Sequence, residues 1–496
     1  MTAVVAPRAA PLSPERLEPL NLPNPAPTAG LQPQLLLPGE AGYAARQESY
    51  WSLSSGQVQP AAIFRPSSAQ DVSAAVQALV QAKQPFAVRS GGHGFAFSNN
   101  IDGGVTIDLG QLSTVVYDIA SETVTFGAGC LWQDVYDELH KYGRAVSGAR
   151  EGDVGVGGLL LGGGVTFFTS RHGFACDNVL AYEVVLADGR TVNVDRESHP
   201  DLFRCLKGGS NNFGVVTKFT MVTIPCAKVW GGMAVMPRQA IPAAIESVVS
   251  FADNVVNDAD SDLTAIITHT PEFKDVVVSS LFVNVAGVEK PAAYDQWLAQ
   301  PQIRNTAKMT SLPALVREAK VPGMMREIWF TLTLKNDARI LTYASALHDQ
   351  LVADLTAFIP GQEFITKCIF QHLPTVAIQN SVAAGRNVMG VERQQHNGIL
   401  FHAISMVMTN EQEAFAYEKV KTWVDSVEEF SRGIEGGLLE WRYLNYANKT
   451  QDPMATYGEE NIRLMQGVAA KYDPEEVFQR LCPGGFKVLA IGAQRK

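Results

Sequence analysis

A run of glycines in the first third of the chain limits its possible folds more than any other feature. Of the 42 glycines in 496 residues, six lie between Gly155 and Gly164. They belong to a stretch of 17 uncharged residues, Val154 to Ser170, whose length approaches that of a membrane-spanning helix. Because glycine is a poor helix former, we expect tight backbone turns here and no membrane span.

The composition excludes several classes of protein. With 46% hydrophobic and 18% charged residues the chain is typical of a globular protein, and its length corresponds to about three domains. The net charge of -10 argues against nucleic acid or an anionic membrane as a partner. The six cysteines lie far apart without a CxxC pair, so we expect mostly buried free thiols.

The N-terminal segment is rich in proline. Proline and charge interrupt each apolar run in the first 30 residues, which argues against a signal peptide. We therefore predict a loosely ordered leader over residues 1–45 and a cytoplasmic location.

The pattern of strands, turns and helices in the rest of the chain changes near residue 226. Before it, short strands alternate with glycine-rich turns and a few helices. After it, alternating strands lengthen and are separated by amphipathic helices, which predicts an antiparallel sheet covered by helices. In this second part the pattern predicts strands over 263–269, 276–285, 399–408 and 438–446, and helices over 340–358 and 411–430.

The strongest candidate for a reactive residue lies in one of two glycine-rich turns. The sequences RSGGHG over 89–94 and VGVGGLLLGGG over 154–164 allow backbone N–H groups to converge on an anion. Neither turn matches a P-loop or a nicotinamide-binding fingerprint. His93 stands inside the first turn, where an imidazole can serve as nucleophile, acid or base, ligand or covalent tether. Nothing near His172 and Cys176 completes a metal site, so we predict no metal.

These and further motifs resemble a known family. The matching text comprises RSGGH at 89–93, VGVGG at 154–158, GGG at 162–164, HGFACDNV at 172–179, VLADG at 185–189, DLF at 201–203, KGGSNNFGVVT at 207–217, YLNY at 443–446 and YDPEEVF at 472–478. In this order they resemble the vanillyl-alcohol-oxidase or PCMH-type flavoproteins, in particular the berberine-bridge-like branch with fungal FAD-linked oxidases of secondary metabolism. The stretch from about 226 to 436 carries no comparable text.

The resemblance implies a fold and a division of the chain. The implied fold is of the α+β class. It has a two-lobed FAD-binding domain over 46–225, an inserted substrate domain over 226–436, and a C-terminal segment over 437–496 that completes the FAD domain. It also implies cofactor contacts from Arg89, Ser90, Gly91, Gly92, His93, Gly94, Val154, Gly155, Gly157, Gly158, Gly164, Val216 and Asn445.

In this family the histidine of the SGGH turn is bonded covalently to FAD, so the resemblance carries that role to His93. Members with a second link place a cysteine three residues before the valine of the VGVGG turn, and this chain has Glu151 there. A carboxylate cannot form the thioether. We therefore predict a single covalent link.

The family places its catalytic groups around the YxNY text, which maps to Tyr443, Asn445 and Tyr446 on a predicted strand. Tyr446 or Tyr443 is the predicted base, and neighbouring groups must then stabilise its phenolate at neutral pH. The alternative is that both tyrosines only pack in the core. His402 lies on an otherwise apolar strand face, where it could line a pocket or be an ordinary core histidine. The same two alternatives apply to His372.

The leading hypothesis is an oxidase of a small aromatic, alkaloid or polyketide-like metabolite. Its covalent FAD takes a hydride, and O2 then reoxidises the flavin to give H2O2. Val154 lies where oxygen-reactive members keep a small residue, which weakly favours an oxidase. A cyclase whose FAD is mainly structural, and a flavin carrier without activity, are the alternatives. The sequence determines neither the substrate nor the oligomeric state.

Overall fold

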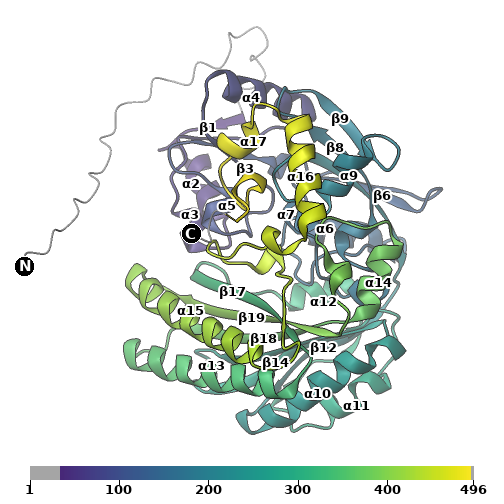
Figure 1. Ribbon diagram of the computed structural model, residues 1–496, viewed down its shortest axis with the longest axis vertical. Helices are drawn as coiled ribbons and strands as arrows, with labels where there is room; N and C mark the ends of the chain where they lie inside the picture. Colours follow the sequence, from purple (N-terminus) through teal and green to yellow (C-terminus); the bar gives the residue numbers. More distant parts are fainter. Residues whose placement is uncertain (1–33, 493–496) are drawn as a thin grey trace, which may run out of the picture.

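The computed structural model describes residues 34–492, and its first layer is a small sheet near the N-terminus (Figure 1). Strands β2, β4 and β3 run parallel, and β1 joins the edge of β2 antiparallel. Helix α4 begins at the N-cap Ser68, whose hydroxyl accepts a hydrogen bond from the N–H of Asp71. The bounds are β1 Leu35–Leu36, α2 Ala41–Glu48, α3 Leu53–Gly56, β2 Ala62–Phe64, α4 Ala69–Gln81, β3 Phe86–Arg89, α5 Ala96–Asn99 and β4 Val105–Asp108.

A five-stranded antiparallel sheet follows, in the order β5-β6-β10-β8-β9. Its core is continuous with that of the first sheet. That these two sheets are the two lobes of an FAD-binding domain stays a prediction. The bounds are β5 Val115–Asp118, β6 Thr123–Gly127, α6 Trp132–His140, β7 Arg144–Ala145, α7 Val156–Leu161, α8 Thr169–His172, β8 Val179–Val185, β9 Thr191–Asp195, α9 Pro200–Leu206, β10 Val215–Val222 and β11 Ile224–Pro225.

The middle of the chain forms a nine-stranded antiparallel sheet, which confirms the sheet predicted there. Helices α10, α13 and α15 cover one of its faces. The strands are β12 Val229–Met236, β13 Ser261–His269, β14 Val276–Asn284, β15 Arg304–Asn305, β16 Lys308–Thr310, β17 Arg326–Lys335, β18 Ile365–Leu373, β19 Gly398–Val407 and β20 Leu438–Leu439. The helices are α10 Ile241–Asn254, α11 Asp295–Leu298, α12 Leu312–Glu318, α13 Ala338–Phe358, α14 Thr375–Ala383 and α15 Asn410–Arg432.

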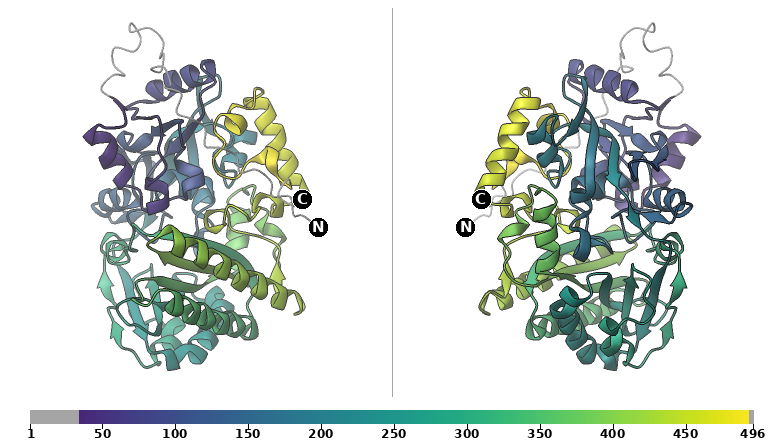
Figure 2. Two further views of the ribbon diagram at one scale, coloured as in Figure 1. Left: turned by 90° about the vertical axis from the view of Figure 1, so that its left-hand side faces the viewer. Right: turned by 90° about the vertical axis from the view of Figure 1, so that its right-hand side faces the viewer.

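The C-terminal segment returns to the first two sheets. Helices α16 (Glu459–Tyr472) and α17 (Val477–Arg480) lie beside them, far from the helices of the large sheet (Figures 1 and 2). Lys471 and Tyr472 contact the carboxylate of Asp201 on α9. We call this part, residues 34–226 and 440–492, the upper unit, and residues 229–439 the lower unit.

The uncovered face of the large sheet points toward the upper unit (Figure 2). On that face an apolar cluster of Ile365, Ile369, Ile404 and Met406 packs with Trp51 of the upper unit. The opposite face carries the core under the helices. Side chains that alternate onto the uncovered face therefore lie between the two units.

Two sequence-based expectations are corrected. Ordered structure begins before residue 46, because Leu35 and Leu36 pair with β2 and α2 begins at Ala41; residues 1–33 of the predicted leader lie outside the described residues. The strand predicted over 438–446 ends at Leu439, and a 3-10 turn follows at Leu444–Tyr446.

The remaining expectations concern cysteines and membranes. All six cysteines are buried and free, as predicted. Within residues 34–492, no helix is long and apolar enough to cross a membrane.

Candidate functional site

The two glycine turns touch each other through their backbones. A Cβ on Gly91 would lie 2.6 Å from the Cα of Gly155, and one on Gly155 would lie 2.3 Å from the N of Gly91. Ser90 locks the contact, because its hydroxyl donates to the carbonyl of Ala128 at 2.6 Å and accepts from the N–H of Gly157 at 3.2 Å. Glycine is therefore required at both crossing positions.

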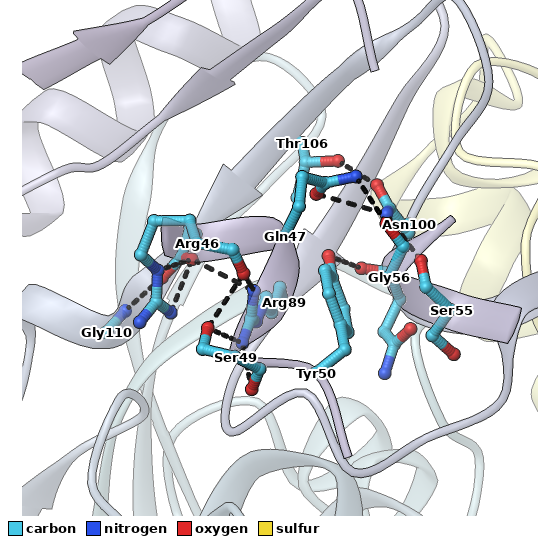
Figure 3. A network of polar contacts seen from close by, with 12 residues as sticks. Arg46, Gln47, Ser49, Tyr50, Ser55, Gly56, Arg89, Asn100, Thr106 and Gly110 are labelled. Atoms are coloured by element: carbon cyan, nitrogen blue, oxygen red, sulfur yellow. Dashed lines mark hydrogen bonds and ion pairs between the residues drawn. The ribbon is translucent and has the colours of Figure 1, made fainter. Parts of the chain in front are cut away.

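Arg89 supports the first turn from behind. Its guanidinium is buried and donates to the carbonyl of Arg46 at 2.7 Å and to Ser49, and it lies over the ring of Tyr50 (Figure 3). Gly92, with φ +79°, leaves room for this guanidinium, since a Cβ there would approach it to 2.7 Å. The Arg89 side chain thus holds the turn, and its predicted contact with the cofactor stays a prediction.

His93 projects from the turn and is held on two sides. Its ring stacks on Trp51, with the centroids 4.4 Å apart, and its Nε2 lies 3.2 Å from a carboxylate oxygen of Glu151. The other oxygen of Glu151 accepts a hydrogen bond from the N–H of Val321. Among the described residues, Nδ1 of His93 has no hydrogen-bond partner. The ring is therefore oriented with one nitrogen engaged and the other free to react.

The end of the second glycine run is tied to the C-terminal turn. The Tyr443 hydroxyl accepts hydrogen bonds from the N–H groups of Gly164 at 3.0 Å and Val165 at 2.9 Å, and the amide of Asn445 donates to it. A Cβ on Gly162 would strike Asn445. Burial raises the pKa of Tyr443, and neighbouring Tyr446 raises it further. These contacts support the packing alternative for Tyr443.

Tyr446 has a different environment. Its hydroxyl accepts a hydrogen bond from the guanidinium of Arg150 at 2.8 Å and donates to the side-chain oxygen of Gln371 at 3.2 Å. Burial lowers the pKa of Arg150, but Tyr446 and Asp262 outweigh this effect and raise it. A permanent positive charge at hydrogen-bond distance stabilises negative charge on the Tyr446 oxygen.

His402 stacks directly on Tyr446, with ring centroids 4.3 Å apart. Its Nε2 is buried without a hydrogen-bond partner among the described residues. Burial lowers the pKa of His402 far below its ordinary value, and Lys367 and Arg150 add to this effect. The imidazole is therefore neutral near pH 7. Whether His402 lines a substrate pocket or is an ordinary core histidine stays a prediction.

A row of aromatic rings connects the two halves of the site. His93 stacks on Trp51, Trp51 meets the edge of Trp329 at 5.5 Å, Trp329 meets His402 at 4.6 Å, and His402 stacks on Tyr446. The predicted tether and the predicted base, 353 positions apart in the chain, thus belong to one contiguous set of side chains.

Sequence reasoning missed several members of this set. Arg150, Gln371, Trp51, Trp329 and Lys367 were not singled out. Gln371 pairs with Leu400 of β19, and Lys367 pairs with Ile404. Both side chains therefore share the sheet face that carries His402. Alternation along residues 365–373 was a usable indication for these two. The other three become visible only once the fold brings distant segments together.

The remaining predicted residues are distributed as follows. Gly94 lies against Asn99, whose amide would be 3.0 Å from an added Cβ. Val154 is half-buried, Val216 is buried on β10, and Gly158 is exposed with open space where its Cβ would be. Their contacts with a cofactor stay predictions.

The residues present fit a flavin. The glycine turns leave the backbone accessible at Gly158, His93 offers a free ring nitrogen, and the facing wall carries an orphaned His402 nitrogen and the hydroxyl of Tyr446. This donor set suits a planar, largely uncharged ring flanked by groups that move protons. Within the described residues, no group of three or more His, Cys, Asp or Glu side chains could hold a metal ion.

Comparisons with known proteins identify the matching family. A family model for an FAD binding domain matches residues 60–195. The chain is 33% identical over 466 residues to the FAD-dependent monooxygenase drtC of Aspergillus calidoustus, covering 92% of this chain and 88% of that one. It is 32% identical over 434 residues to the bifunctional solanapyrone synthase of Alternaria solani, covering 87% and 82% respectively.

Solved structures share the fold. BBE-like 1 of Physcomitrella patens superposes with a TM-score of 0.72 at 18% identity, covering 89% of this chain and 95% of that one. Glucooligosaccharide oxidase of Acremonium strictum superposes with a TM-score of 0.72 at 19% identity, covering 93% and 97%. The latter structure concerns a 6-S-cysteinyl, 8α-N1-histidyl FAD.

Proposed function

Because the chain belongs to the vanillyl-alcohol-oxidase or PCMH-type family of FAD-dependent oxidoreductases, in its berberine-bridge-like branch, we propose that it oxidises a small secondary metabolite of aromatic, alkaloid or polyketide type. The substrate would lie against the uncovered face of the large sheet. The observation that carries this proposal is the aromatic row that joins His93 to Tyr446 and Arg150.

The cofactor would be held by one covalent bond, at Nδ1 of His93. In glucooligosaccharide oxidase the FAD is joined to a histidine and to a cysteine. Here Nε2 is already engaged by Glu151, which favours Nδ1 as the attacking nitrogen. Glu151 also occupies the position at which the family resemblance places the second link, and a carboxylate cannot make that bond. Its role would be to hold the His93 ring through Nε2, which leaves Nδ1 available to carry the cofactor.

Bound FAD supplies a hydride acceptor and, by reaction with O2, a route to reoxidation. The chain's own residues would handle the proton. Tyr446 is the proposed base, Arg150 stabilises its phenolate, and Gln371 fixes the direction of its hydroxyl through the 3.2 Å hydrogen bond. Neutral His402 and Trp329 would pack against the substrate and exclude water.

The fate of O2 separates an oxidase from a monooxygenase, the activity named for drtC. For an oxidase we expect one H2O2 for each O2 consumed and no ¹⁸O from ¹⁸O2 in the product, because both atoms of O2 leave as peroxide. Mass spectrometry of the product and peroxide titration, run on the same turnover sample, measure the two quantities. Incorporation of ¹⁸O with less than stoichiometric peroxide would instead establish a monooxygenase.

A cyclase is the second candidate, favoured by the bifunctional synthase among the relatives. Anaerobic addition of substrate distinguishes the two. Bleaching of flavin absorbance near about 450 nm supports oxidation. Product formation without bleaching would favour cyclisation with a structural FAD.

A further inference from the structure

Lys367 is an ammonium without a bound acceptor on the sheet face that meets the upper unit. It lies on β18, opposite Thr268 of β13 and Ile404 of β19, and Ile404 in turn lies opposite Trp329 of β17. Residues directly opposite in a sheet share a face. Lys367 therefore stands in one row with Trp329, a member of the aromatic row between His93 and Tyr446.

The surroundings of Lys367 are mostly apolar. Ile365, Ile369, Ile404 and Met406 share its face and pack together with Trp51. Cys368 and Phe370 of the same strand point into the core under the helices, so the opposite face of β18 is already filled. Burial lowers the pKa of Lys367 to about 8, partly opposed by Glu151. At neutral pH Lys367 is therefore protonated in most molecules.

The protein does not satisfy this ammonium. Within residues 34–492, Lys367 forms no hydrogen bond or ion pair, and Glu151 uses its two oxygens on His93 and on the N–H of Val321. The hydroxyl of Thr268 donates to a carbonyl of β18. Lys367 is half-buried, so solvent or a ligand can reach its ammonium, and the apolar surroundings favour a ligand group that carries negative charge.

We propose that Lys367 is a specificity-determining residue that binds a deprotonated acidic oxygen of the substrate, either a carboxylate or the enolate of a 1,3-dicarbonyl group. The inference rests on the proposed function, since it takes the substrate to lie on this face. An ion pair in this apolar setting would orient the substrate with one end at Lys367 and the other toward Tyr446 and His93.

The other charged groups around Lys367 determine how its binding depends on pH. From the upper unit Glu151, His93 and Arg150 face this region, and β19 contributes neutral His402. β17 contributes Glu327, whose pKa burial raises to about 8. Rising pH through 8 therefore both neutralises Lys367 and charges Glu327, and each change would weaken the binding of an anion.

The test measures binding to the FAD-loaded protein, so it is independent of turnover. Benzoate serves as the carboxylate probe and the dimedone anion as the enolate probe, with benzamide and the methyl enol ether of dimedone as neutral counterparts. We expect Lys367→Met to lower the affinity for one or both anions by about 10- to 100-fold. The affinity for the neutral probes should change by less than about threefold. Flavin content confirms that the variant keeps its cofactor.

Two further variants separate the groups that titrate. For wild type the anion Kd is expected to rise about tenfold per pH unit above roughly pH 8. Lys367→Arg should remove the part of this rise that comes from the loss of the lysine charge, because arginine keeps its charge, whereas Glu327→Gln should keep that part and remove only the contribution of the Glu327 carboxylate. Unchanged anion affinity in Lys367→Met, equal loss of neutral and anionic probes, or no anion binding by wild type would overturn the proposal. A failure of the oxidase proposal would instead leave these affinities intact.

Discussion

Replacing Tyr446 by Phe is expected to lower kcat by about 10²- to 10⁴-fold, with unchanged flavin content, because the site would lose its proposed base. The ring would still stack on His402, so packing is largely preserved. Turnover under saturating substrate and flavin absorbance together measure the effect.

Tyr443→Phe is the matched control. It removes a hydroxyl that accepts two backbone N–H groups, from Gly164 and Val165. We expect a stability loss of about 1–3 kcal/mol for each N–H left unsatisfied and a much smaller change in kcat. If Tyr443→Phe instead loses most of kcat while Tyr446→Phe remains active, the assignment of the base is wrong.

Gly155→Ala is expected to destabilise the holoprotein and to reduce its FAD content. The added Cβ would lie 2.3 Å from the backbone N of Gly91 and push the two glycine turns apart. Overpacking against backbone costs about 1–3 kcal/mol or more. The melting temperature and the ratio of FAD to protein report the two effects.

Gly158→Ala is the control for this change, three residues away in the same run. Nothing lies within 4 Å of the Cβ it would add. We expect a melting temperature close to that of the wild type. Full FAD content and an unchanged melting temperature in Gly155→Ala would show that the turns do not need their close contact.

The sequence predicted the parts of the fold that depend on local pattern. The helices expected over 340–358 and 411–430 correspond to α13 and α15, because long amphipathic segments bury one face whatever their partners. The strands expected over 263–269 and 399–408 correspond to β13 and β19, which are buried almost throughout and so read as apolar runs rich in strand-forming residues. Motif order was enough to identify the family.

The pattern failed where a turn imitates a strand. Apolar residues alternate around Trp441 and Tyr443, which also suits a buried turn whose side chains pack in the core of the upper unit. Tyr443 is fixed there by the backbone of the second glycine run, a contact across 279 positions. Local periodicity does not contain that information.

The chemistry of the site depended on still longer contacts. Arg150 and Tyr446 meet across 296 positions, and Glu151 lies beside His93 across 58. The sequence indicated His93 and Tyr446 through their motifs. The fold was needed to show that Arg150 and Glu151 orient them, and that Lys367, whose strand face alternation could have indicated, lies near them.

Mapping the flavin attachment tests the account most directly. We predict that a digest of denatured holoprotein yields one flavin-bearing peptide, which contains His93, and that His93→Ala releases its FAD on acid precipitation. Mass spectrometry of the peptides and the flavin absorbance of the supernatant measure both. A second flavin-bearing peptide, or flavin that stays bound to His93→Ala after denaturation, would contradict a single link at His93.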